Sequence, residues 1–145
     1  MTENANKIGV GLFMIASHFL AIVVLVLLTF IGGFSIDEMT TTIGFIGPLF
    51  AGYSSVIIAY IIKHKSDTSY GEGIVNPVYA LVSFAVPALF VLIIFSLIFL
   101  KAFNFGVTDF SIFKTIIGLV EGAFGLYVGQ FIYSMFEAKK TETKG

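Results

Sequence analysis

Four long apolar segments, separated by short polar stretches, limit what this chain can fold into. Each is long enough, at 1.5 Å of rise per residue in an α-helix, to cross about 30 Å of hydrocarbon. The composition agrees, because 57% of the residues are hydrophobic and only 12% are charged, about half the charged share of a typical soluble domain. We therefore predict an all-α integral membrane protein in which one four-helix bundle, surrounded by the lipid bilayer, takes up the whole chain. Its spans are residues 8–34, 39–62, 77–100 and 110–136.

Three sequence signals mark where helices begin. Ser35 and Glu38 have the S-x-x-E spacing of a capping box, which predicts the start of the second helix. Asn76 followed by Pro77 is typical of an N-cap and a first helical position. Thr108 or Asp109 is the expected cap of the last helix, and residues 137–145 form a polar tail.

The lysines predict the orientation of the bundle. There is no arginine, and six of the eight lysines lie before the first span, between the second and third spans, or in the tail. Lys101 and Lys114 lie near the connection between the third and fourth spans. Because lysine is enriched in cytoplasmic loops, we predict that both termini are cytoplasmic, in the inner membrane if the chain is bacterial.

Small residues form a row on two of the helices. This spacing allows close approach of helix backbones in lipid. The rows either pack the second and fourth helices together within one subunit, or one of them forms a subunit interface or lines a pore. Because a chain of this length has little room for a wide conduit, we expect a homo-oligomer with the fourth or second helix at the interface. The residues are Gly118, Gly122, Gly125 and Gly129 on the fourth helix and Gly47, Ala51 and Ser55 on the second.

Two polar residues lie at similar depth inside the predicted membrane spans. A carboxylate at bilayer depth costs about 2.5–3.5 kcal/mol on insertion scales, so Glu121 is expected to face protein or a water-filled path. His18 differs from it in depth by only about 7 Å. If the first and fourth helices touch, the two pair directly or through a water. They are either hydrogen-bonded structural groups or groups that bind ions or protons or line a pore.

Pro48 and Pro87 interrupt the second and third spans. Each removes a backbone hydrogen bond, so each is either a structural kink or a gating hinge. A faint similarity between the two halves places Gly44 on Gly118 and Tyr53 on Tyr127. This similarity is consistent with a parallel duplication of a two-helix hairpin, and also with chance matches in apolar sequence.

The sequence also excludes several kinds of protein. It has no cysteine and no catalytic motif, and its net charge is -1. We therefore expect no enzyme activity, no metal site, no cofactor and no nucleic-acid partner.

We predict that the protein forms an ion-conducting pore or a regulated membrane-permeabilising element. The alternative is a non-catalytic membrane anchor or sensor subunit that works with a soluble cytoplasmic partner, for example in a stress or phage-defence system. That inference is by analogy of architecture. Such a partner would bind the Lys63–Gly73 loop or the C-terminal tail.

Overall fold

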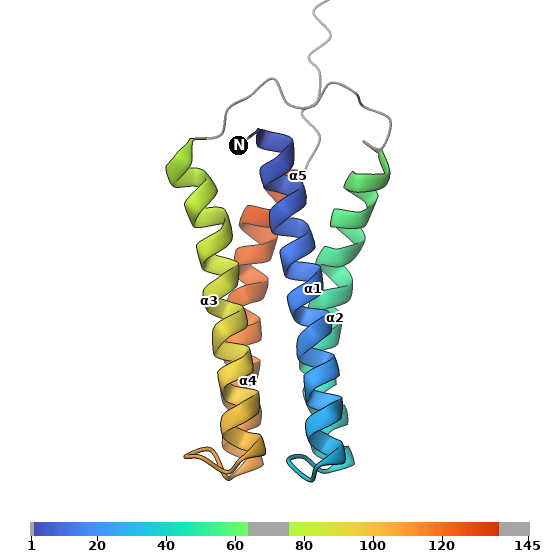
Figure 1. Cartoon of the computed structure of the whole chain (residues 1–145), viewed down its shortest axis with the longest axis vertical. Coiled ribbons are helices and arrows are strands. Elements are labelled where there is room, and N and C mark those ends of the chain that lie inside the picture. The colour runs from blue at the N-terminus through green and yellow to red at the C-terminus, as the bar shows by residue number, and fades with distance from the viewer. Residues whose placement is uncertain (1, 64–75, 137–145) are drawn as a thin grey trace, which may run out of the picture.

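The protein is a bundle of four long helices that run alternately down and up. The computed structural model describes residues 2–63 and 76–136. In Figure 1 the start of α1 and the end of the chain's helical part lie at one end, which we call the termini end; the two short connections lie at the other, the loop end. The prediction of an all-helical chain with four helices long and apolar enough to cross a membrane is confirmed. The elements are α1 (Glu3–Phe30), α2 (Ile36–Lys63), α3 (Pro77–Ala102), α4 (Phe110–Tyr127), the π-helix η1 (Val128–Ile132) and α5 (Tyr133–Phe136).

The four helices are arranged as a square. Helix α1 packs mainly against α2 and α3, and α4 packs mainly against the same two helices, so α1 and α4 lie on one diagonal and α2 and α3 on the other. A two-fold axis along the bundle would place equivalent helices of two duplicated hairpins on the diagonals. Here they are neighbours instead, so the arrangement lends no support to the predicted duplication, which stays a prediction.

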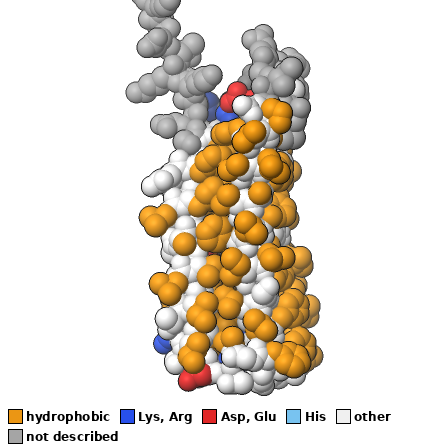
Figure 2. All heavy atoms as spheres, turned by 90° about the vertical axis from the view of Figure 1, so that its left-hand side faces the viewer, with side chains coloured by type: hydrophobic (Ala, Val, Ile, Leu, Met, Phe, Trp, Pro, Cys, Tyr) orange, Lys and Arg blue, Asp and Glu red, His pale blue; other side chains and the backbone are white. Residues whose placement is uncertain are grey.

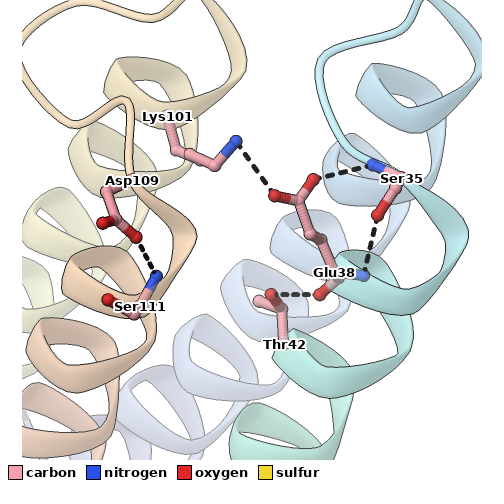
Figure 3. Close-up of polar contacts among 6 residues, drawn as sticks. All are labelled: Ser35, Glu38, Thr42, Lys101, Asp109 and Ser111. Atoms are coloured by element: carbon pink, nitrogen blue, oxygen red, sulfur yellow. Dashed lines mark hydrogen bonds and ion pairs between the residues drawn. The ribbon is translucent and has the colours of Figure 1, made fainter.

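The expected helix caps are present. The Ser35 N–H donates to Glu38 Oε2 at 2.8 Å, and the Glu38 N–H donates to Ser35 Oγ at 3.2 Å, which closes the predicted capping box (Figure 3). Asn76 accepts a hydrogen bond from the Val78 N–H at 2.9 Å. Of the two candidate caps of α4, Asp109 is the one used, because it accepts from the Ser111 N–H at 2.7 Å.

Helices α2 and α3 agree with the predicted spans to within three residues, whereas α1 and the last span differ from theirs in bounds or in type. Helix α1 begins at Glu3 because Thr2 caps it, accepting from the Ala5 N–H at 3.3 Å. It ends at Phe30, and Gly32 then takes a φ of +83°, a left-handed conformation that suits glycine. The last span is helical to its predicted end, but it changes from an α-helix to a π-helix at residue 128. The apolar pattern contains no signal for that change.

Two apolar clusters fill the bundle, one toward each end. Both clusters draw on residues from several helices, so the interior is packed with side chains above and below the middle of the bundle. The loop-end cluster contains Leu25, Leu28, Phe34, Ile46, Ile94, Ile98, Phe113 and Ile117, among others. The termini-end cluster contains Val10, Met14, Tyr53, Ile57, Phe124, Val128 and Phe136, among others.

The outer surface is also apolar. Figure 2 shows hydrophobic side chains along the length of one face, with charged side chains near its two ends. Around the bundle as a whole, the outer surface includes large exposed side chains such as Phe19, Leu27, Leu92 and Leu119. An apolar surface of this size on a monomer suits contact with lipid rather than with water.

Candidate polar site inside the bundle

His18 of α1 is held inside the bundle by a carbonyl group and aromatic rings. Its side chain is 1% exposed, and Nδ1 lies 3.1 Å from the Met14 carbonyl oxygen. The ring stacks on Phe124 of α4 with a centroid distance of 5.1 Å, and Phe50 of α2 lies parallel to it at 6.4 Å. Three helices therefore fix the orientation of this imidazole.

Tyr53 of α2 completes the surroundings of His18. Its ring meets the imidazole edge-on at 5.3 Å, and its hydroxyl donates to the Met14 carbonyl oxygen at 3.3 Å. Ser17 Oγ donates to the same carbonyl at 3.1 Å. The Met14 carbonyl thus accepts hydrogen bonds from several side chains, which ties α1 to α2 at this level.

Glu121 of α4 lies in the bundle interior, as its position on the helix predicts. The residue is 5% exposed, and neither carboxyl oxygen has a hydrogen-bond partner among the described residues. Three other buried polar atoms within that part of the chain share this state: His18 Nε2, Ser54 Oγ and the Tyr127 hydroxyl. Buried polar atoms are nearly always hydrogen-bonded, so an unpaired group of this kind needs an explanation.

The structure brings His18 and Glu121 to the same region without joining them. Their helices lie on a diagonal of the bundle, yet His18 stacks on Phe124, about one helical turn from Glu121. The Tyr53 ring contacts both His18 and Phe124, with centroid distances of 5.3 Å and 6.1 Å. The direct hydrogen bond predicted as one way of pairing is not formed.

Three further residues, Tyr53, Ser54 and Tyr127, belong to this site but were not predicted from the sequence. On an apolar helix a tyrosine or a serine is normally a core or packing residue, so their identity alone gives no signal. The sequence did contain one signal, which is the depth of these residues within the predicted membrane spans. Ser54 and Tyr53 lie near the middle of the second span, as His18 does in the first and Glu121 in the fourth.

Two glycines of the α4 row face another helix of the bundle, and the other two face outward. A Cβ added to Gly118 would lie 3.5 Å from the Phe45 ring, and one added to Gly125 would lie 3.6 Å from Leu49, so these two glycines face α2. A Cβ added to Gly122 or Gly129 would meet no atom of a neighbouring element within 4 Å among the described residues. These two positions are exposed.

The small residues of α2 do not pack against that row. Ala51 and Ser55 are exposed, and a Cβ on Gly47 would meet within 4 Å only Ile43 of its own helix. Helices α2 and α4 do pack against each other within the subunit, with Gly118 and Gly125 facing α2, but neither row meets the other directly. The α2 row and part of the α4 row face outward.

The two prolines lie inside continuous helices. Pro87 is buried in α3, and Pro48 is exposed in α2. Near Pro87, the Ser83 hydroxyl donates to the Ala80 carbonyl at 2.9 Å and accepts from Asn6 Nδ2 at 3.1 Å. Their role as hinges stays a prediction.

An ion pair between Lys101 and Glu38 links α3 to α2 at the loop end of the bundle. Lys101 Nζ of α3 lies 3.2 Å from Glu38 Oε1 of α2 (Figure 3). The same Nζ lies 5.5 Å from the centre of the Phe34 ring. In the same region the backbone N–H of Ser111 donates to Asp109 and holds the pKa of that carboxyl below its ordinary value. The sequence placed Lys101 only near a connection; its pairing across the diagonal depends on the packing of the helices.

Within residues 2–63 and 76–136, no group of three or more histidine, cysteine, aspartate or glutamate side chains is placed to hold a metal ion. The chemistry that the interior can supply is therefore that of single carboxyl, imidazole, phenol and hydroxyl groups. Comparison of the chain with models of protein families, with curated proteins and with solved structures finds no match.

Proposed function

We propose that this is a membrane protein that conducts ions, with Glu121 on the conduction path. The observation that carries the proposal is the state of Glu121 in a membrane-spanning helix. Its carboxyl group is buried in the bundle, and neither of its oxygens is hydrogen-bonded by a described residue. Ionisable groups inside membranes are costly, and they commonly mark ion or proton pathways.

The comparison with other buried polar groups of the bundle favours a functional role. Asn6 and Ser83 hydrogen-bond each other at 3.1 Å, and the Thr42 hydroxyl donates to the Glu38 carbonyl at 2.7 Å. These groups are satisfied by the protein itself, as structural polar groups in a membrane are expected to be. Glu121 lacks such a partner among the described residues, as do His18 Nε2, Ser54 Oγ and the Tyr127 hydroxyl. Among these groups the carboxyl is the one whose ionised form is most costly to bury unpaired in a membrane, so a purely structural role does not account for it.

Homo-oligomerisation, cytoplasmic termini and, if the chain is bacterial, a location in the inner membrane belong to the same proposal. The outward-facing small residues Gly122, Gly129, Ala51 and Ser55 support an interface between subunits, because they permit close helix contact in lipid. In the sequence six of the eight lysines lie near the start of α1, between the end of α2 and the start of α3, or in the tail, and the other two, Lys101 and Lys114, lie near the connection between α3 and α4. That difference supports cytoplasmic termini.

The test is ion flux through proteoliposomes that contain the purified full-length protein. We compare the wild type with Glu121→Gln, which keeps the shape of the side chain and removes its charge. Asp37→Asn is the matched control, because it makes the same chemical change at an exposed position near the loop end. We expect the wild type and Asp37→Asn to conduct and Glu121→Gln to lose most of the flux. Equal flux in all three would place Glu121 off the path.

The second candidate is a non-conducting anchor or sensor subunit that acts with a soluble partner, for example in stress response or phage defence. The observation that favours it is the packing of apolar clusters toward both ends of the bundle, on either side of the polar site. The partner sites predicted from the sequence, the Lys63–Gly73 loop and the tail, lie outside the described residues except for Lys63 itself. Correctly folded wild-type protein without any ion flux would favour this candidate over conduction.

A further inference from the structure

We infer that the ion handled at this site is the proton, and that Glu121 exchanges it with Nε2 of His18. The inference rests on the proposed conduction and names its substrate. Its geometric basis is that His18, whose Nε2 has no hydrogen-bond partner among the described residues, stacks on Phe124, about one helical turn from the unpaired carboxyl group of Glu121 on the same helix.

The hydrogen bond of His18 determines which nitrogen is available. A carbonyl oxygen only accepts, so the 3.1 Å contact with Met14 requires Nδ1 to carry a hydrogen. In the neutral ring Nε2 then holds the lone pair, and no described residue donates to it. When Nε2 takes up a proton, the Nδ1 hydrogen bond is kept, so the ring accepts the proton without changing its orientation.

The surroundings of the ring suit a proton and not a metal cation. The faces of the imidazole are covered by Phe124 at 5.1 Å and Phe50 at 6.4 Å, and Tyr53 meets its edge. Aromatic faces stabilise a cationic ring, but they supply no oxygen ligands. A calcium ion needs about six to eight oxygen ligands and magnesium about six, and the described residues offer no cluster of metal ligands.

The charges around His18 fit an exchange with Glu121. Helix α2 brings Tyr53, α4 brings Glu121 and Tyr127, and α3 brings the Phe90 ring, 5.0 Å from the Phe124 ring. Among these groups Glu121 is the one carboxylic acid, so it is the group that becomes an anion when it gives up its proton. In the exchange the O–H bond of the carboxyl breaks as the Nε2–H bond forms, leaving a carboxylate and an imidazolium whose charges compensate. Since the two groups are not hydrogen-bonded, a side-chain rotation or a bridging water must complete the path.

The experiment measures proton flux and metal-cation flux separately on the same proteoliposomes. Internal pH is followed with a trapped dye while valinomycin and potassium clamp the voltage. In separate vesicles without valinomycin, potassium and sodium efflux are followed with ion-selective electrodes. The variants are Glu121→Gln, His18→Gln and the control Ser96→Ala, which removes an exposed hydroxyl of α3 that donates to the Leu92 carbonyl of its own helix.

We expect wild-type and Ser96→Ala vesicles to pass protons but neither potassium nor sodium, and both glutamine variants to lose the proton flux. Potassium or sodium flux comparable to the proton flux would overturn the inference and leave conduction standing. Unchanged proton flux in His18→Gln would overturn the role of His18. Absence of any flux would overturn the proposed function, and the inference with it.

A second measurement does not depend on whether His18→Gln folds. The ¹⁵N spectrum of labelled histidine, recorded in a His64→Gln background, reports the tautomer of His18 directly. We expect a protonated Nδ1 and an unprotonated Nε2 at neutral pH. A ring that carries its hydrogen on Nε2 would overturn the assignment of the accepting atom.

Discussion

The ion pair between Lys101 and Glu38 gives a prediction in which two single variants lose different amounts of stability, because the two side chains are buried to different extents. The variants are Glu38→Gln, which keeps an acceptor for the Ser35 N–H, and Lys101→Met, which keeps most of the chain length. The side chain of Lys101 is 8% exposed and that of Glu38 is 22% exposed. Removing the charge of Glu38 therefore leaves a cation with little access to water, whereas removing Lys101 leaves a carboxylate that reaches water more easily.

The size of the effect follows from the 3.2 Å separation of Nζ and Oε1. At an effective dielectric constant of about 20, the gross attraction at this distance is about 5 kcal/mol. Desolvation offsets much of it, since breaking a fully buried pair costs about 3–5 kcal/mol and an exposed pair contributes less than about 1 kcal/mol. For this partly exposed pair we expect Glu38→Gln to lower the free energy of unfolding by about 2–3 kcal/mol and Lys101→Met by about 1 kcal/mol.

The assay is reversible unfolding in mixed detergent micelles with increasing dodecyl sulfate, followed by circular dichroism, for both single variants and the double variant. The cycle should give a coupling energy of about 1–3 kcal/mol, because the two groups are in direct contact. Equal losses in the two single variants would refute the argument from burial. A coupling energy under about 0.5 kcal/mol would show that the pair adds nothing beyond its separate side chains.

Two further predictions concern the loop end. Gly33→Ala should lower the free energy of unfolding by about 1–3 kcal/mol, because its Cβ would lie 2.9 Å from the Ala102 Cβ; the micelle titration measures this, and an unchanged midpoint would mean that the loop moves freely away from α3. Asp109→Asn should be less stable than the wild type at neutral pH, because the pKa of Asp109 is lower in the folded chain than its ordinary value. That stabilisation is present above the unfolded-state pKa and is lost as pH falls through the folded-state pKa, so titrations repeated at decreasing pH should converge; a difference independent of pH would contradict the prediction.

Much of the helical structure was predictable because its signals are local. The capping box at Ser35 and Glu38 and the Asn76–Pro77 pair mark where α2 and α3 begin, and each acts through hydrogen bonds within a few residues. The burial of Glu121 was predictable too, since a carboxylate facing hydrocarbon is costly. The π-helix at residues 128–132 was not, because the apolar pattern is similar for an α-helix and for a π-helical turn.

By itself, then, the sequence determined the number of long helices, the start of several of them and an apolar character that suits a membrane. Which face of each helix turns inward was decided only by the tertiary structure. In a bilayer the lipid-facing and core-facing sides of a helix are both apolar, so hydropathy does not distinguish them. Packing alone placed His18 against Phe124, turned Gly122 outward, and brought Lys101 to Glu38 across the diagonal of the bundle.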